Sequence, residues 1–142
     1  SSSASNKNAT TDKQLYDLAL ASLKDKNLSD AEGKFAEFIK KYPNSPLVSN
    51  AYFWYGDIFY QNKMFDKAAI NYLKGYKQSP KGDKASDSLL KSALSLGELK
   101  KNKEACSILS KLEAEFPNRA SASKKRATDA EIKYGCNKQG KK

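Results

Sequence analysis

Two cysteines and the absence of histidine limit the chemistry that this sequence could perform. Cys106 and Cys136 are 30 residues apart, which excludes a C-x-x-C redox pair. A zinc site would need further sulfur or imidazole ligands, and the sequence contains none. Without histidine, imidazole-based acid–base catalysis and every catalytic triad that uses it are excluded. We therefore expect no catalytic, cofactor-binding or metal-binding residues and no enzymatic activity.

An aromatic run, AYFWYGDIFY at residues 51–60, suggests a different kind of chemistry, the recognition of another protein chain. Trp and Tyr side chains often anchor a bound peptide segment. On a helix, the run is apolar or aromatic around most of the circumference, which is more than the packing of one helix pair requires. The alternative is that Phe53 and Trp54 are core residues, because helical spacing alone does not separate the two cases.

Positive charge is the third feature that bears on partners. The sequence has 142 residues, with 26 Lys and Arg against 16 Asp and Glu, and a net charge of +10. Residues 119–142 hold eight of the basic residues and two of the acidic ones. No aromatic stacking platform accompanies the cluster Lys124-Lys125-Arg126, so we interpret it as a solvated basic end and expect no nucleic-acid partner. A weak contact with a polyanion is the alternative. No run of apolar residues is long enough to span a membrane.

The elements that would position these groups form an internal repeat. A fixed step of 37 residues relates Ala31, Ala68 and Ala105; Pro43, Pro80 and Pro117; Phe35, Tyr72 and Leu109; Leu15, Tyr52 and Leu89; and Ala19, Gly56 and Ala93. Such a period indicates a solenoid, in which each unit buries its apolar face against its neighbours. Each copy has helical spacing in two segments, such as residues 50–61 and 65–76. One more helix, over residues 119–134, would cap the last copy.

These positions resemble the tetratricopeptide repeat, and the middle copy matches best, through Tyr52, Gly56, Phe59, Ala68, Tyr72 and Pro80. The resemblance implies an all-α fold, a right-handed solenoid of three helix hairpins plus a C-terminal capping helix. The expected bounds are 1–11 for a polar linker or disordered terminus, 12–136 for the repeat domain, with repeats at about 12–48, 49–85 and 86–118 and the cap at 119–136, and 137–142 for a disordered tail.

The same resemblance implies a partner-binding groove, because the first helix of each tetratricopeptide repeat lines the inner surface of the solenoid. The groove residues expected here are Tyr16, Leu20, Leu23, Asn50, Phe53, Trp54, Asp57, Tyr60, Gln61, Leu90, Lys91 and Leu94. The side chains of Tyr52, Tyr55 and Phe59 are expected in the core between the helices instead.

The predicted elements also bring the two cysteines to one end of the solenoid. Cys106 falls in the second helix of the third copy, and Cys136 falls just after the capping helix that must dock there. A disulfide between them would close a 30-residue loop and stabilise the fold by about 3–4 kcal/mol through loop entropy. Such a bond indicates an oxidising compartment. The alternative is a buried thiol at Cys106 and an exposed one at Cys136.

Four local patterns narrow the resemblance to one family. They are Tyr42-Pro43-Asn44-Ser45-Pro46, the run from Ala51 to Gly56, Phe116-Pro117-Asn118 and Gly135-Cys136. Together they resemble the C-terminal domain of the CpoB (YbgF) family of periplasmic, Tol-Pal-associated cell division coordinators. In that family a polar linker joins this domain to an N-terminal trimeric coiled coil, and SSSASNKNATTD at residues 1–12 is similar to such a linker. The resemblance thus implies a signal peptide and a coiled coil upstream.

The family implies a non-enzymatic adaptor in the Gram-negative periplasm. It would bind a TolA-like segment and the peptidoglycan synthesis machinery, and so coordinate wall synthesis with outer-membrane constriction during division. The full-length protein would be trimeric through the coiled coil. Two alternatives remain: an outer-membrane protein assembly scaffold of the BamD type, which shares the YPNSP-like signature, and a basic polyanion-binding module of helical repeats.

Overall fold

The structure is a computed structural model that describes residues 10–139. Helical hairpins make up this part of the protein. Within this range, seven helices of 13 or 14 residues follow one another, and a helix of 4 residues comes last. The bounds are α2 (Asp12–Lys24), α3 (Leu28–Lys41), α4 (Val48–Gln61), α5 (Phe65–Gln78), α6 (Ala85–Glu98), α7 (Asn102–Glu115), α8 (Ser121–Tyr134) and α9 (Cys136–Gln139). This order confirms the predicted all-α solenoid of three hairpins followed by a capping helix.

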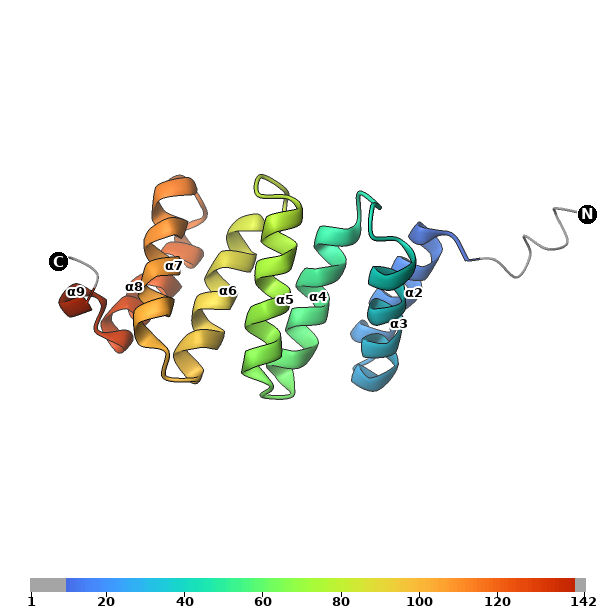
Figure 1. The fold of residues 1–142 in the computed structure, drawn as a ribbon, viewed down its shortest axis with the longest axis horizontal. Helices are drawn as coiled ribbons and strands as arrows, with labels where there is room; N and C mark the ends of the chain where they lie inside the picture. The colour runs from blue at the N-terminus through green and yellow to red at the C-terminus, as the bar shows by residue number, and fades with distance from the viewer. Residues whose placement is uncertain (1–9, 140–142) are drawn as a thin grey trace, which may run out of the picture.

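The helices lie in two layers (Figure 1). In that view α3, α5 and α7 form the front layer, and α2, α4, α6 and α8 form the layer behind it. Side chains link neighbours within the rear layer: the indole of Trp54 on α4 donates a hydrogen bond of 3.0 Å to the hydroxyl of Tyr16 on α2, and Lys91 on α6 forms an ion pair of 2.9 Å with Asp57 on α4. We call the surface of α2, α4, α6 and α8 that points away from the front layer the inner face.

Small residues let the two helices of the middle hairpin approach closely. A Cβ atom on Gly56 would lie 2.8 Å from Cδ1 of Tyr72, whose ring is fully buried. A Cβ atom on Gly75 would lie 2.9 Å from the backbone oxygen of Ser49. Ala68 is fully buried as well. The repeated small residues Gly56 and Ala68 therefore lie where the two helices of the middle hairpin pack most closely.

The turn inside each hairpin has the same strained residue. Lys26, Lys63 and Lys100, again 37 residues apart, adopt φ angles of 62°, 60° and 62°. In the middle turn, the amide of Met64 donates to the carbonyl of Phe59 at 2.8 Å and the amide of Lys63 donates to that of Tyr60 at 3.0 Å. The other two turns have the same pair of bonds, which is the Schellman arrangement that usually ends in glycine. Each lysine therefore occupies a left-handed conformation that an L-residue adopts only at a cost.

The capping helix α8 buries only three of its side chains, those of Ala127, Ala130 and Tyr134. The ring of Tyr134 lies on Gly97 of α6, where a Cβ atom would come within 2.1 Å of the ring carbon Cζ. Gly135 ends α8 in the left-handed region, at φ 70°. Ala130 lies 37 residues after Ala93 and Tyr134 lies 37 residues after Gly97, so α8 corresponds to the first helix of a fourth copy.

The two cysteines meet behind the cap, because the Gly135 turn directs the chain back towards α7. The Sγ atoms of Cys106 and Cys136 are at bonding distance, and their Cα atoms are 5.3 Å apart. This pairing is the one predicted. A free thiol at an exposed Cys136 does not fit, since both residues are buried.

The chain ends differ in part from expectation. The side chain of Thr11 accepts a hydrogen bond from the amide of Gln14 and so caps α2. Most of the linker expected at 1–11 lies outside the described residues. At the other end, α9 continues helical structure to Gln139, where the sequence suggests a disordered tail from residue 137. Residues 140–142 of that tail are likewise outside the described range.

Candidate protein-binding face

One repeated position that was expected to line the groove lies in the hydrophobic core instead. Tyr16, Phe53 and Leu90 lie at equivalent places in the three copies, and their exposed fractions are 8%, 3% and 2%. The rings of Tyr16 and Phe38 are 5.9 Å apart between centroids, and those of Phe53 and Tyr72 are 5.6 Å apart. This position thus packs against the second helix of its own hairpin. The expectation that these three side chains line an open groove is therefore corrected.

Trp54 lies half-buried at the middle of the inner face. Besides its hydrogen bond to Tyr16, the indole packs edge-on against Phe53, with centroids 5.1 Å apart. The ammonium of Lys84 lies 4.7 Å from the centroid of the Trp54 ring. A cation so placed is attracted to the face of the ring and covers part of it. The Trp54 indole is therefore less accessible to a partner than an aromatic anchor in an open groove would be.

Asp57 joins three helices near this indole. Its carboxylate accepts hydrogen bonds from the hydroxyl of Tyr72 on α5 and from the ammonium of Lys91 on α6. Burial raises the pKa of the Tyr72 hydroxyl far above its usual value, and the negative charge of Asp57 raises it further. Asp57 and Lys91 thus lie on the inner face as predicted, with their charges already paired.

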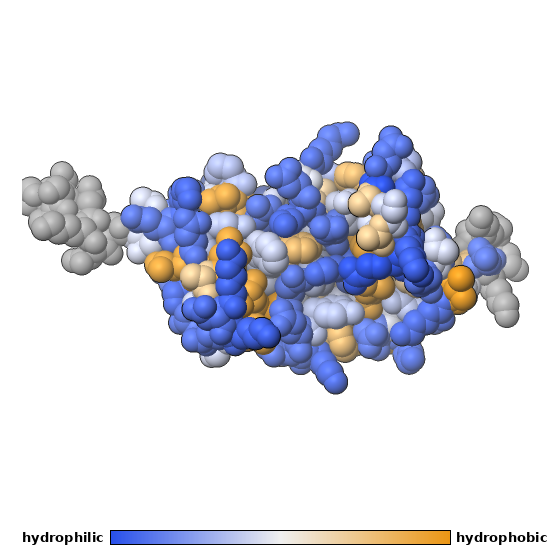
Figure 2. All heavy atoms as spheres, turned by 180° about the vertical axis from the view of Figure 1, so that it is seen from behind, coloured by the Kyte–Doolittle hydropathy of each residue, from blue (hydrophilic) through white to orange (hydrophobic). Residues whose placement is uncertain are grey.

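The remaining predicted groove residues are accessible to a partner. Gln61 is exposed, and the partly exposed ones are Leu20, Leu23, Asn50, Tyr60 and Leu94. They come from α2, α4 and α6, so the accessible part of the inner face spans all three repeats. Figure 2, which views this side, shows hydrophobic residues as separate spots among hydrophilic ones. Within the run at 51–60, Phe53, Ile58 and Phe59 are buried, whereas the tyrosines and Trp54 stay partly exposed.

A pocket of about 310 Å³ opens where α4, α6 and α8 meet. Its lining residues are Tyr60, Leu94, Glu98, Arg126, Asp129, Ala130, Lys133 and Tyr134. Of these residues, only Tyr60 and Leu94 are among the groove residues expected from the sequence, whereas the basic cluster suggested that Arg126 belongs to a solvated end. One signal was present in the sequence: Arg126, Ala130 and Lys133 have the spacing of one helix face, and Ala130 is in phase with the small residues of the repeats.

Charges of both signs act on Tyr60, which lines this pocket. Burial raises the pKa of Tyr60, and Glu98 on α6 raises it further, whereas Arg126 on α8 lowers it. Burial also raises the pKa of Tyr134, with smaller effects from Tyr60 and Glu98. The hydroxyl of Tyr60 therefore lies in the fields of both a carboxylate and a guanidinium, which come from two different helices.

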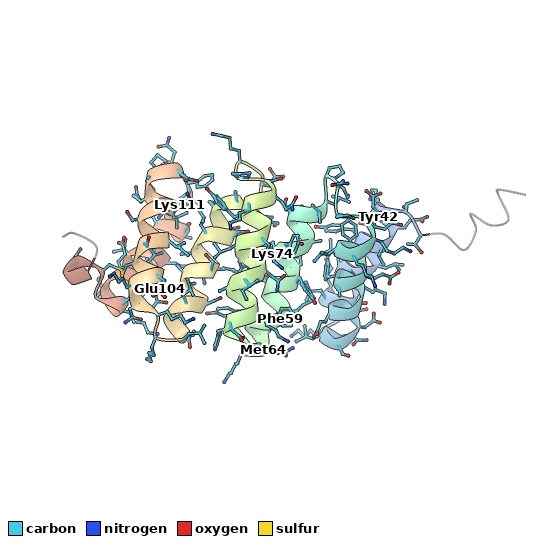
Figure 3. All side chains as sticks on the ribbon, in the orientation of Figure 1. Tyr42, Phe59, Met64, Lys74, Glu104 and Lys111 are labelled. Atoms are coloured by element: carbon cyan, nitrogen blue, oxygen red, sulfur yellow. A yellow bond between two sulfur atoms is a disulfide. The ribbon has the colours of Figure 1, made fainter. Side chains whose placement is uncertain are left out.

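The front layer offers a contrasting surface. Figure 3 labels Lys74, Glu104 and Lys111 on the outer helices α5 and α7, and all three side chains are exposed. Lys111 pairs with Glu115 one turn later on the same helix, at 2.8 Å. Such pairs on a solvated helix face contribute little to stability. The front layer also has a pocket, of about 350 Å³, which Tyr76, Pro80, Lys81, Glu115 and Phe116 line at the ends of α5 and α7.

Residues 10–139 contain neither a cluster suited to a metal ion nor a helix suited to crossing a membrane. No group of three or more carboxylate or thiol side chains there is placed to hold a metal ion. None of the helices in this part of the chain is both long enough and apolar enough to cross a membrane.

Comparison with known proteins supports the repeat assignment. The sequence model of the tetratricopeptide repeat matches residues 15–45 and 87–119, which are the first and third hairpins. The middle hairpin lies outside these ranges, although its residues resemble the repeat pattern best and its structure has the same two helices and turn.

Two Pseudomonas putida proteins, both described as "Cell division coordinator CpoB", are similar to part of the chain. Each is 38% identical to it over 47 residues, which is 33% of this chain and 18% of the relative. The matched segment thus spans less than a fifth of the length of these relatives. The first and third hairpins thus match the tetratricopeptide repeat, and the middle hairpin has the same two helices and the same turn.

Proposed function

We propose that this protein is a non-catalytic adaptor that binds a segment of a partner protein along its inner face. Tetratricopeptide repeats are protein-interaction modules, and the partial match to two cell division coordinators supports a role in division. The observation that carries the proposal is the row of accessible side chains from Leu20 on α2 to Tyr60 on α4 and Leu94 on α6, which crosses all three repeats.

The finer proposal is a place in the Tol-Pal system of the Gram-negative periplasm. There the protein would bind a TolA-like segment and the peptidoglycan synthesis machinery, and coordinate wall synthesis with outer-membrane constriction. Its support is the similarity to the CpoB proteins together with the pairing of Cys106 and Cys136, which suits an oxidising compartment. A trimeric full-length protein, assembled through an upstream coiled coil, belongs to the same proposal.

Titration with purified TolA tests this function. Trp54 is the sole tryptophan and lies on the inner face, so its emission is expected to shift as TolA covers it. Leu20→Ser should weaken binding about tenfold, because it removes a partly exposed apolar contact. Leu20 also packs against the core of the first hairpin, so an unchanged circular dichroism spectrum must accompany the loss. The matched control is Leu18→Ser, since Leu18 is 51% exposed on the same helix but outside the accessible row.

Two results would count against the proposal. Equal weakening by Leu18→Ser and Leu20→Ser would show that the inner face has no special part in binding. An affinity that falls steeply with salt and is indifferent to Leu20→Ser would instead indicate the polyanion-binding alternative.

A further inference from the structure

The turn between α2 and α3 carries a sequence pattern that partner binding on the inner face does not explain. Asp25, Lys26 and Asn27 join the two helices, and Leu28 and Ser29 begin α3. Asn27-Leu28-Ser29 has the form Asn-x-Ser, in which the asparagine amide is a glycan acceptor in exported proteins. Asp25 adds a carboxylate two positions before this asparagine, and bacterial oligosaccharyltransferases recognise an acidic residue there.

We propose that Asn27 is N-glycosylated by a membrane-bound oligosaccharyltransferase outside the cytoplasm. The proposal goes beyond the proposed function and shares with it only the compartment. In the reaction, Nδ2 of Asn27 forms a bond to the anomeric carbon of an oligosaccharide that is carried on a polyprenyl pyrophosphate. The bond from that carbon to the pyrophosphate oxygen breaks, and the lipid pyrophosphate leaves with the electron pair. Nδ2 releases one proton to a carboxylate of the transferase.

The amide group of Asn27 has one atom committed to the fold and one that is free. Asn27 is exposed, and its Oδ1 accepts a hydrogen bond of 3.2 Å from the amide of Asp30, which caps α3. Its Nδ2 donates no hydrogen bond to any residue from 10 to 139. Glycosylation replaces a hydrogen on Nδ2 and leaves Oδ1 in place. The modified residue therefore still caps the helix.

Room for a sugar exists beside this amide. A shallow hollow of about 570 Å³ is lined by Asn27, Ser29, Asp30, Gly33, Lys34 and Glu37. Gly33 lies within α3, where glycine costs about 1 kcal/mol of helix stability relative to alanine. Its neighbours do not require a glycine, because a Cβ atom there would meet nothing within 4 Å. The open backbone of Gly33 instead leaves space for the first sugar attached to Asn27.

The segment can also leave its helical conformation at small cost. The transferase must reach the side chains of Asn27 and Ser29 together. Leu28 and Ser29 belong to the first turn of α3, whose amides have no partner within the helix. Unwinding this turn breaks the cap and the bond of 3.0 Å from the amide of Ala31 to the Asn27 carbonyl. It also releases Lys26 from its left-handed conformation, so the folded protein is itself an acceptor.

The other turns and asparagines of the chain make Asn27 distinct. The equivalent positions of the second and third hairpins hold Met64 and Lys101, so the pattern belongs to the first repeat alone. One Asn-x-Thr sequence occurs elsewhere, Asn8-Ala9-Thr10, and it has Asn6 rather than an acidic residue two positions earlier. Asn8 lies outside the described residues.

Mass spectrometry of the protein isolated from the cells that naturally produce it tests the proposal. Trypsin cleaves after Lys26 and Lys34 and so releases residues 27–34 as one peptide. This peptide should carry the added mass of an oligosaccharide and release sugar fragment ions. Asp25→Ala should lower the modified fraction about tenfold, because a charge-assisted hydrogen bond to the transferase is lost.

Two variants remove the modification without removing the helix cap. Asn27→Asp keeps a carboxylate oxygen that caps α3 and has no amide nitrogen, so the glycan should be absent. Ser29→Ala keeps the Asn27 amide and removes the hydroxyl that the transferase recognises, so the glycan should again be absent. The matched control is Asn44→Gln, in an exposed turn where Pro46 follows Ser45, and it should leave the glycan unchanged. All three variants should retain the wild-type circular dichroism spectrum.

The proposal is overturned if residues 27–34 carry no glycan, if Asn27→Asp or Ser29→Ala retains the added mass, or if Asn44→Gln abolishes it. An unchanged modified fraction in Asp25→Ala would overturn the assignment to a transferase of the bacterial type. Failure here is separate from failure of the proposed function. Titration of the Asn27→Asp variant with TolA tests the inner face without the glycan, and the mass of residues 27–34 does not depend on that partner.

Discussion

The middle hairpin and the capping helix are stabilised in different ways. In the α4–α5 hairpin, glycines allow side chain and backbone to approach within van der Waals contact, and hairpins pack on both sides. The cap α8 buries three side chains, rests on Gly97 through one aromatic ring, and is joined to α7 through the cysteine pair. Where a helix buries little surface, individual contacts must hold it, and much of its surface stays available for a ligand.

Truncation of one buried ring in each region should sharpen this contrast most. Tyr72→Ala should lower the free energy of unfolding by about 3–5 kcal/mol, because it empties a fully enclosed site and removes one of the two hydrogen-bond donors to Asp57, the other being Lys91. Tyr134→Ala should cost less, since α8 can settle onto the space above Gly97. Urea denaturation of both variants measures the difference. Equal losses would mean that the cap is packed as firmly as the middle hairpin.

Removal of either cysteine should loosen the cap and leave the middle hairpin intact. Cys106→Ser and Cys136→Ser should each lower the free energy of unfolding by about 3–4 kcal/mol. The two losses should be equal, because each substitution opens the same loop. Hydrogen exchange should accelerate in α8 and remain slow in α4 and α5. The wild-type mass should lie a pair of hydrogens below that of the reduced chain. Two reactive thiols in protein isolated from the periplasm would contradict the bond.

An Ala-to-Leu substitution in the middle hairpin and another in the cap test how far the packing of each region can adjust. Ala68→Leu should cost about 1–3 kcal/mol, because extra methylene groups have no space at the centre of the middle hairpin. Ala127→Leu should cost less, although Ala127 is also buried, since only the four-residue helix α9 packs beyond α8. Melting temperatures of the two variants provide the measurement. A larger loss for Ala127→Leu would reverse the comparison.

The smallest effects concern the turn that all three hairpins share. Lys26→Gly, Lys63→Gly and Lys100→Gly should each stabilise the protein by about 0.5 kcal/mol. Relief of the left-handed lysine exceeds the entropy that glycine adds to the unfolded chain. Lys74→Gly, at an exposed helical site of α5, is the matched control and should destabilise by about 1 kcal/mol. If Lys63→Gly destabilises too, the lysine side chain makes a contact that offsets its strain.

The sequence predicts the repeat well because the relevant information is local. Ala68 and Gly56 are small for a reason that recurs in each copy, and Pro80 ends a helix by its own chemistry. The pairing of Cys106 with Cys136 also follows once the cap is placed. All of these depend on the 37-residue period and on neighbouring helices of one hairpin.

The candidate site is less predictable because it depends on which helix covers which side chain. Helical spacing places Phe53 on one side of α4, but it does not say that α5 packs against that side. The pocket combines Tyr60, Leu94 and Arg126, which lie far apart in sequence, and the role of Gly97 appears only when Tyr134 is placed above it. Arg126 is exposed like its lysine neighbours, so neither its charge nor its exposure identifies it as a pocket residue.

The position of the cysteines also determines how the protein would carry mechanical load. Helix α8 lies entirely between Cys106 and Cys136 in the sequence. With these residues joined, a pulling force applied beyond Cys136 passes through the sulfur bridge into α7 and bypasses α8. The helix that supplies Arg126 and Lys133 would then bear no tension while the rest of the solenoid is stretched. A pull that unravels α4 would remove Tyr60 from the pocket, but it would leave α8 itself without tension.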